Sequence, residues 1–176
     1  MTAYGGKFSY LSHMFVIRQA LDETNPHLMT IATLTGHAFL AAGLGYSIVM
    51  SNKVAEHKKV AQEIAECGEI LGEPFERSQL RREDYERHFT KLDFEDLLQC
   101  HKNPSSQTPR GHQIPPAFMI LGSGLSEHGI DSDRPIPYTH IDMAASDSDM
   151  SELYGGRPMG TPVLSLAKQF ILPRIQ

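Results

Sequence analysis

Two short stretches place polar side chains directly on apolar strand-like sequence, where they could hold a ligand. Thr33 to Gly36 follows the apolar run Leu28–Ala32 and offers two hydroxyls and backbone groups, but a strand end with a turn glycine explains the same residues. In His140-Ile141-Asp142 the two polar side chains share one face of a strand. One histidine and one aspartate are too few for a closed metal site, so we interpret them as a buried, hydrogen-bonded pair.

Three further patterns have both a chemical and a structural interpretation. Gly5-Gly6-Lys7 is a weak phosphate-loop signal because no Gly-x-x-x-x-Gly-Lys-[Ser/Thr] follows. The carboxylates Asp147, Asp149 and Glu152 could attract Ca²⁺ or Mg²⁺, but their spacing is not that of an EF-hand, and a solvated loop explains them. In the turn-like stretch 154–162, Arg157 could pin a carboxylate or a helix C-terminus, although a structural turn is favoured.

Composition favours a globular protein that acts on neither nucleic acid nor membrane. The chain has 176 residues, 40% apolar and 21% charged, with a net charge of −5. That charge disfavours a broad nucleic-acid surface. No apolar run approaches the roughly 20 residues of a membrane span. Cys67 and Cys100 lack Cys-x-x-Cys spacing, so we expect reduced thiols and a cytoplasmic location.

Periodicity and turn signals predict the elements that would position these stretches. Strands are expected at Leu28–Ala32, buried on both faces, at Ser47–Met50 and at Tyr138–Ala144. The interval 72–99 is interpreted as irregular with short helices, and 103–116 and 131–137 as loops. Helices are expected at Phe8–Leu21, at Lys53–Cys67 with Asn52 as cap, at Ala117–Leu125, and from Pro158 onward.

Strands separated by helices predict an α/β fold with a mainly parallel β-sheet flanked by helices. Ligands of such sheets bind at the carboxyl ends of the strands. Thr33–Gly36 and Ala144–Ser148 both follow predicted strands, so these two loops are the expected site.

Four motifs in order resemble the C-terminal half of the catalytic domain of the leucine aminopeptidase family, the M17 metallopeptidases. The stretch 32–36, ATLTG, matches the family, and 140–145, HIDMAA, is similar to its His-Leu-Asp-Ile-Ala-Gly strand. The stretch 155–160, GGRPMG, is similar to its Thr-Gly-Arg-Pro turn, and 94–99, FEDLLQ, stands where the family has Ala-Asp-Leu. The resemblance extends from about Phe8 onward, and it implies that the N-terminal domain and the first half of the catalytic domain lie outside 1–176.

The resemblance implies a site for the N-terminal end of a peptide. Family members are hexamers that remove N-terminal residues with two divalent metals, zinc or manganese, which activate a water molecule. Thr33, Leu34 and Gly36 match positions that line the substrate site, Leu34 through its backbone carbonyl. Ala144 matches the pocket for the first side chain. Asp147 stands at the edge of that pocket, where several members carry an apolar residue.

The catalytic half of that site departs from the family pattern. A lysine and two aspartates that bind metal in the family lie upstream of the region matched here. The remaining ligands come from Asn-Thr-Asp-Ala-Glu-Gly-Arg, which corresponds to residues 1–7. Ala3 and Gly5 replace both carboxylates, and Lys7 stands at the arginine position, the one catalytic residue that carries over. Two cations without anionic ligands repel each other, so we expect this chain to bind no metal.

Two classes of function therefore stay open. One is a leucine aminopeptidase-like protein of the family, inactive as 1–176 alone. The other is a non-catalytic structural or peptide-binding protein that retains the M17 fold. Peptide N-termini and a second copy of the chain in a homo-oligomer are the expected partners.

Overall fold

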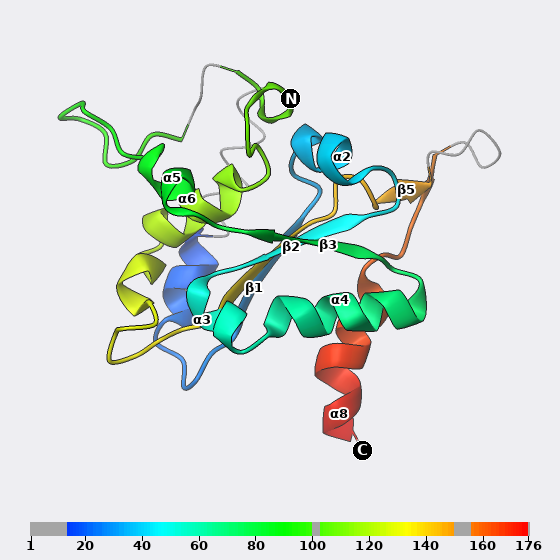
Figure 1. Cartoon of the computed structure of the whole chain (residues 1–176). Helices are drawn as coiled ribbons and strands as arrows, with labels where there is room; N and C mark the ends of the chain where they lie inside the picture. The colour runs from blue at the N-terminus through cyan, green and yellow to red at the C-terminus, as the bar shows by residue number, and fades with distance from the viewer. Residues whose placement is uncertain (1–13, 100–102, 150–155, 176) are drawn as a thin grey trace.

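The computed structural model describes residues 14–99, 103–149 and 156–175. In this part of the chain an α/β fold with a four-stranded sheet in the order β1-β4-β2-β3 is covered by helices on both faces (Figure 1). The strands are β1 (Leu28–Ala32), β2 (Ser47–Ser51), β3 (Phe75–Gln79) and β4 (Tyr138–Asp142). The pairs β1–β4 and β2–β3 are parallel, and β2–β4 is antiparallel. The predicted fold class is confirmed.

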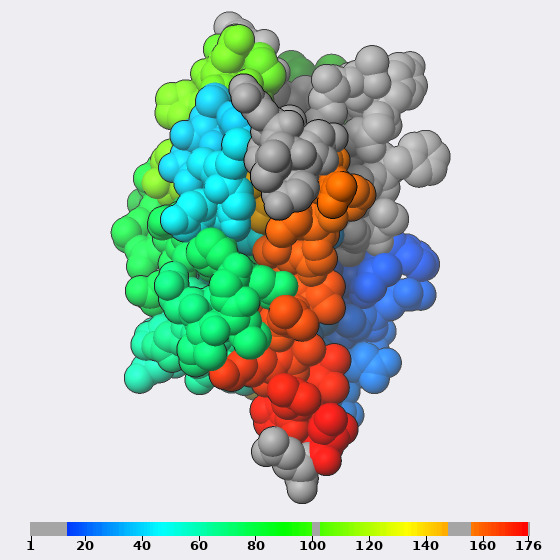
Figure 2. All heavy atoms as spheres, turned by 90° about the vertical axis from the view of Figure 1, so that its right-hand side faces the viewer, coloured from blue at the N-terminus to red at the C-terminus, as the bar shows by residue number. Residues whose placement is uncertain are grey.

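Helices on one face pack against the alternating residues that point to that side of the sheet. This layer contains α3 (Lys53–His57), α4 (Val60–Leu71), α7 (Val163–Leu166) and the π-helical turn η3 (Ala167–Ile171), which continues into α8 (Leu172–Ile175). Figures 1 and 2 show the C-terminal segment beside α4. The core of this layer is formed by Val49, Ala55, Val60, Ile64, Phe75 and Ile141. Such burial of branched apolar side chains is the main stabilising term of the fold.

The opposite face carries the helix over 14–20, α2 (Gly36–Ala42), α5 (Arg82–Glu86), α6 (Ile114–Gly122) and two 3₁₀ turns, η1 (Ser105–Gln107) and η2 (Leu125–His128). Its core joins Ile17, Leu28, Met119, Ile120, Leu125, Ile136 and Tyr138. A hairpin of β5 (Ser148–Asp149) and β6 (Arg157–Pro158) lies at the edge. No helix among the described ranges is long and apolar enough to cross a membrane.

Several predicted elements are confirmed, and others are wrong. The strands at 28–32 and 47–50 are present, and Asn52 caps α3 by accepting a hydrogen bond from the Ala55 amide. The predicted helix over 53–67 is instead two helices, because Lys59 adopts a left-handed conformation with φ 58°. The second of them continues past Gly68 to Gly72, whose φ of 73° ends it.

Four more expectations need correction. The interval 72–99 contains β3, and α6 begins at Ile114, before the predicted Ala117, with two prolines tolerated in its first turn. The strand predicted to reach Ala144 ends at Asp142. Pro158 lies in β6, and the last helix begins at Val163. The start of the helix predicted from Phe8 lies outside the described residues.

The predicted burial of β1 on both faces is also wrong. β1 is an edge strand, and Ile31 is 38% exposed. Beside it, Phe15 and Val16 on the helix over 14–20 are 64% and 61% exposed. An open parallel strand with apolar neighbours is a surface that other polypeptide normally covers.

The beginning of α7 depends on the buried carboxylate of Glu73. It accepts hydrogen bonds from the Ser165 hydroxyl and amide, at 2.6 and 2.7 Å, and from the Leu164 amide at 3.3 Å. Glu73 therefore joins the α4–β3 turn to a helix that lies about 90 residues later in the chain.

We predict that Glu73→Ala lowers the free energy of unfolding by about 1–3 kcal/mol, because two buried donors lose their acceptor. Urea unfolding followed by circular dichroism measures this change. The matched control is Glu69→Ala on the exposed face of α4, which should change the unfolding free energy by less than about 0.5 kcal/mol. Equal midpoints for the two variants would contradict this role of Glu73.

Candidate functional site

The two loops singled out from the sequence meet at one end of the sheet. In the parallel pair β1–β4, Ala32 lies opposite Asp142, and the Met143 amide donates to the Ala32 carbonyl at 2.9 Å. Both strands therefore end at the same edge, and the loops that follow them, beginning at Thr33 and Met143, lie side by side. This juxtaposition follows from parallel pairing, as expected for the carboxyl ends of neighbouring strands.

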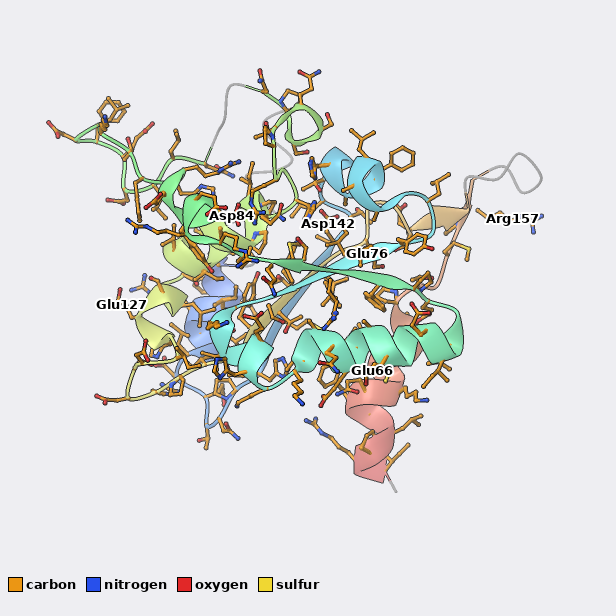
Figure 3. All side chains as sticks on the ribbon, viewed as in Figure 1. Glu66, Glu76, Asp84, Glu127, Asp142 and Arg157 are labelled. Carbon is orange, nitrogen blue, oxygen red and sulfur yellow. The ribbon has the colours of Figure 1, made fainter. Side chains whose placement is uncertain are left out.

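The carboxylate of Asp142 holds the two loops together. One oxygen accepts the Thr35 hydroxyl at 2.5 Å, and the other accepts the Leu34 and Ala144 amides, each at 3.2 Å. The Thr35 amide adds a longer contact of 3.4 Å to the second oxygen. Asp142 is fully buried and lies beneath the start of α2 (Figure 3).

Burial raises the pKa of Asp142, and the hydrogen bonds from Thr35, Leu34 and Ala144 oppose that shift. A carboxylate saturated with donors in this way orders the backbone around it. Thr35 also caps α2, because its hydroxyl oxygen accepts the Ala38 amide at 3.1 Å. Asp142 and Thr35 together fix where the loop turns and where α2 begins.

The loop presents some of the predicted site residues to solvent. Thr33 and Gly36 are exposed, Ala144 is half-buried, and the Leu34 side chain is buried. The Leu34 side chain thus anchors the loop, while its neighbours form an accessible surface. The structure brings Thr33, Leu34, Gly36 and Ala144 together around Asp142. Lys7 lies outside the described residues.

His140 is buried in the sheet and hydrogen-bonded to a neighbouring strand. Its Nδ1 lies 2.7 Å from the Thr30 hydroxyl, which lies 2.7 Å from the Tyr138 hydroxyl, and all three residues are buried between β1 and β4. The prediction that His140 and Asp142 are buried and hydrogen-bonded is confirmed. Each residue bonds to the neighbouring strand or loop.

The described residues do not fit a pair of divalent metals. No group of three or more His, Cys, Asp or Glu side chains within the described ranges is arranged to hold a metal ion. The one carboxylate at the centre of the site, Asp142, already accepts hydrogen bonds with both oxygens, from the Thr35 hydroxyl and from the Leu34 and Ala144 amides. A metal ion there would have to displace those donors.

A pair of histidines beside Gly36 was not assigned a role from the sequence. His37 in α2 and His112 before α6 lie with their Nδ1 atoms 2.8 Å apart. His112 Nε2 lies 2.9 Å from the Ser78 hydroxyl, to which the Gln113 side-chain Nε2 donates at 2.7 Å. His37 directly follows the singled-out loop and could have been noted, but nothing local indicates that His112 reaches it.

Both imidazoles have pKa values below the ordinary range. Burial is the main cause for each. For His112, the neighbouring His37 and Arg110 lower the pKa further, to about 4, against a smaller opposing effect of Asp84. For His37, Asp142 opposes the effect of burial. The pair is therefore neutral at pH 7 and shares one hydrogen bond.

Two other candidate groups lie apart from this site or outside the description. Arg157 is exposed on the β5–β6 hairpin, well away from Asp142 (Figure 3). Glu152 lies outside the described residues, so the suggested acidic patch stays a prediction.

Comparison with known proteins identifies relatives over most of the chain. Residues 14–167 match the catalytic domain of the cytosol aminopeptidase family. A Caenorhabditis elegans protein named "Putative aminopeptidase W07G4.4" is 36% identical over 171 residues. That match covers 97% of this chain and 32% of the relative, so the chain spans about a third of the relative's length.

Solved structures share the fold at low sequence identity. The bottromycin maturation enzyme BotP has a TM-score of 0.65 at 19% identity, with 89% of this chain and 31% of BotP covered. The structure of BotP in complex with Mn has a TM-score of 0.63 at 21% identity, with 86% of this chain and 30% of that BotP chain covered. A variant of tomato leucine aminopeptidase has a TM-score of 0.61 at 18% identity, with 90% of this chain and 27% of the tomato enzyme's chain covered. With residues 14–167 matched to the family's catalytic domain, the chain belongs to the cytosol aminopeptidase family, the M17 peptidases.

Proposed function

We propose that this chain is an aminopeptidase-like protein that binds the N-terminal end of a peptide at Thr33, Leu34, Gly36 and Ala144. The observation that carries the proposal is the Asp142 carboxylate, which ties both loops together and leaves Thr33 and Gly36 exposed beside Ala144. A rigid, partly polar loop at the carboxyl end of parallel strands suits a peptide ligand.

We further propose that residues 1–176 by themselves do not hydrolyse peptides. Removal of an N-terminal residue in this family relies on two divalent metals, zinc or manganese. Ala3 and Gly5 stand at the two carboxylate positions of the family motif. Both oxygens of Asp142 are engaged by protein donors, so Asp142 does not substitute for these carboxylates. Lys7, at the arginine position, would keep a positive charge but not the planar, bidentate donor geometry of a guanidinium.

The chain would form the C-terminal part of an M17 catalytic domain, and further polypeptide would complete it. Three features support this proposal: the share of about a third of the relative's length, the open edge of β1, and the exposed side chains of Phe15, Val16 and Ile31. Because the family assembles as hexamers in the cytoplasm, we propose a homo-oligomer there.

The second candidate function is full aminopeptidase activity in a longer protein. The name of the C. elegans relative favours it, since about two-thirds of that protein lies outside the matched part. Upstream sequence that supplies the lysine and carboxylate ligands would restore a two-metal centre.

We predict that purified 1–176 does not turn over a leucyl chromogenic substrate above background with excess Mn²⁺ or Zn²⁺. An intact leucine aminopeptidase measured in parallel is the positive control, and circular dichroism verifies that 1–176 is folded. Turnover that a chelator abolishes would mean that residues 1–176 contain metal ligands beyond those considered, and would overturn this proposal.

We predict that Gly36→Ala weakens binding of a short peptide with a free N-terminus about tenfold, or about 1.4 kcal/mol. A Cβ at this position meets Ser106 Cβ at 3.4 Å, an ordinary contact, so the variant should fold. The added methyl group should reduce the space for a peptide between Gly36 and Ser106. Fluorescence anisotropy with a C-terminally labelled peptide measures the affinity.

The control for this variant is Gly129→Ala, whose nearest neighbour is the Ser126 carbonyl oxygen at 3.9 Å, far from the site in the chain. An N-acetylated peptide should bind more weakly than the free amine. Identical affinities for both glycine variants, or for both peptides, would argue against recognition at Gly36.

A further inference from the structure

Residues 103–113, here called the strap, run between two separate parts of the fold. The strap contains η1 and ends just before α6. Pro109 and Arg110 are bound to α5 and β3, and Ser106, Gly111 and His112 on either side of them contact α2. The two attachments differ in chemistry, and this difference is the basis of the inference.

The attachment to β3 and α5 is a charged clamp. Arg110 donates through two nitrogens to the two oxygens of the fully buried Asp84, each at 2.7 Å, and also to the Gln79 carbonyl at 2.9 Å. Arg87 donates to the Pro109 carbonyl at 3.2 Å. Bidentate arginine–carboxylate pairs of this kind are among the stronger side-chain interactions. None of these arginine contacts involves a histidine, although His112 also contacts β3 through the Ser78 hydroxyl.

The attachment to α2 depends on close approach and on one hydrogen bond. Ser106 packs against Gly36, and Gly111 lies so near that a Cβ on it would be 2.8 Å from His37 Cβ and 2.1 Å from the Ser105 carbonyl oxygen. The hydrogen bond joins His37 Nδ1 to His112 Nδ1 at 2.8 Å. Ser106 therefore forms one wall beside the exposed Gly36, and the histidine pair holds that wall in place.

We propose that the strap is an acid-sensitive wall of the peptide site, held against Gly36 by the neutral His37–His112 pair and released when the pair takes up protons. This inference rests on the proposed peptide binding at Gly36. It assigns to the same site a form of regulation, in which peptide affinity is highest near neutral pH and falls on mild acidification.

The chemistry of two facing imidazole nitrogens explains the release. In the neutral pair one Nδ1 donates and the other accepts. A first proton leaves the hydrogen bond intact with the proton shared, but a second places two donors face to face. The charged groups nearby are Asp142 beside His37, Arg110 and Asp84 beside His112, and Glu83 beside Arg110. Ser78 and Gln113 are neutral, and Arg110 opposes protonation of His112.

The direction of the pH effect follows from linkage. Both histidines have pKa values below 6.5 when the strap is closed, so the released strap binds protons more tightly. Closure is favoured fully above pH 6.5 and is lost as the pH falls toward 4. With the His112 pKa at about 4 in the closed form, this histidine alone lowers the closing equilibrium about 20-fold between pH 7 and pH 5.

Hydrogen exchange and peptide binding, each measured at pH 7 and pH 5, test the proposal. After correction for intrinsic exchange rates, peptic fragments covering 103–113 should lose protection about 20-fold at pH 5, and affinity for the free-amine peptide should fall in parallel. His112→Asn, whose amide nitrogen can take the place of Nδ1 without titrating, should remove the 20-fold part of both pH effects and leave only the part due to His37. His128→Asn, which changes a histidine bonded to the Arg134 carbonyl, should leave both unchanged.

A second pair of variants keeps the test independent of the histidine substitutions. Gly111→Ala should displace the strap at both pH values, because its Cβ collides with Ser105 and His37, whereas Gly129→Ala should not. Equal protection of 103–113 at pH 7 and pH 5, or a pH effect that is undiminished in His112→Asn, overturns the acid-sensitive strap. If the exchange behaves as expected but no peptide binds at either pH, the strap mechanism stands and the proposed peptide binding fails.

Discussion

The burial of one carboxylate is the constraint around which this end of the molecule is organised. Moving a carboxylate out of water is costly unless hydrogen-bond donors replace the lost hydration. Asp142 meets that condition only if the Thr35 hydroxyl and the Leu34 and Ala144 amides all point at it. Those donors come from segments more than 100 residues apart, so satisfying a single side chain fixes two loops at once.

The same device appears at the other junctions of the fold. At the opposite end of the sheet, the Asn52 side chain donates to the Ile136 carbonyl and accepts from the Ala55 and Tyr138 amides. The Glu73 carboxylate likewise accepts the Ser165 amide at the start of α7. Apolar packing supplies most of the stability of these layers, but it is not directional. Single buried polar side chains determine how the ends of the elements meet.

How well the sequence predicted these features depended on how local each signal is. The continuous apolar run of β1 and the cap at Asn52 are readable from neighbouring residues, and both are confirmed. β3 was missed because its sequence, FERSQ, is polar on an exposed edge and buries little beyond Phe75. The break at Lys59 was missed because a left-handed lysine has no sequence signal.

Within the site, the loop and its strand were identified from pattern and resemblance, and the roles of its residues stay predictions. The histidine pair shows the limit of such reasoning. His37 and His112 are 75 positions apart, and their contact exists because Gly111 has no side chain to separate the strap from α2. The close approach of two backbone segments is a feature of the tertiary structure, and no local sequence pattern predicts it. The carboxylate of Glu73 reaching Ser165 is another of the same kind.

The order of the strands has a consequence for synthesis on the ribosome. β4 lies between β1 and β2, yet Thr30 and its neighbour His140 are 110 positions apart. At roughly 5–20 residues per second, β1 and β2 wait about 5–20 s for the strand that separates them. During that interval the β2–β3 unit can form from local contacts, whereas β1 pairs with β4, which is not yet synthesised. The Asp142 junction is thus among the last parts of the nascent chain to form, and until then the apolar side chains of β1 lack the neighbouring strand β4.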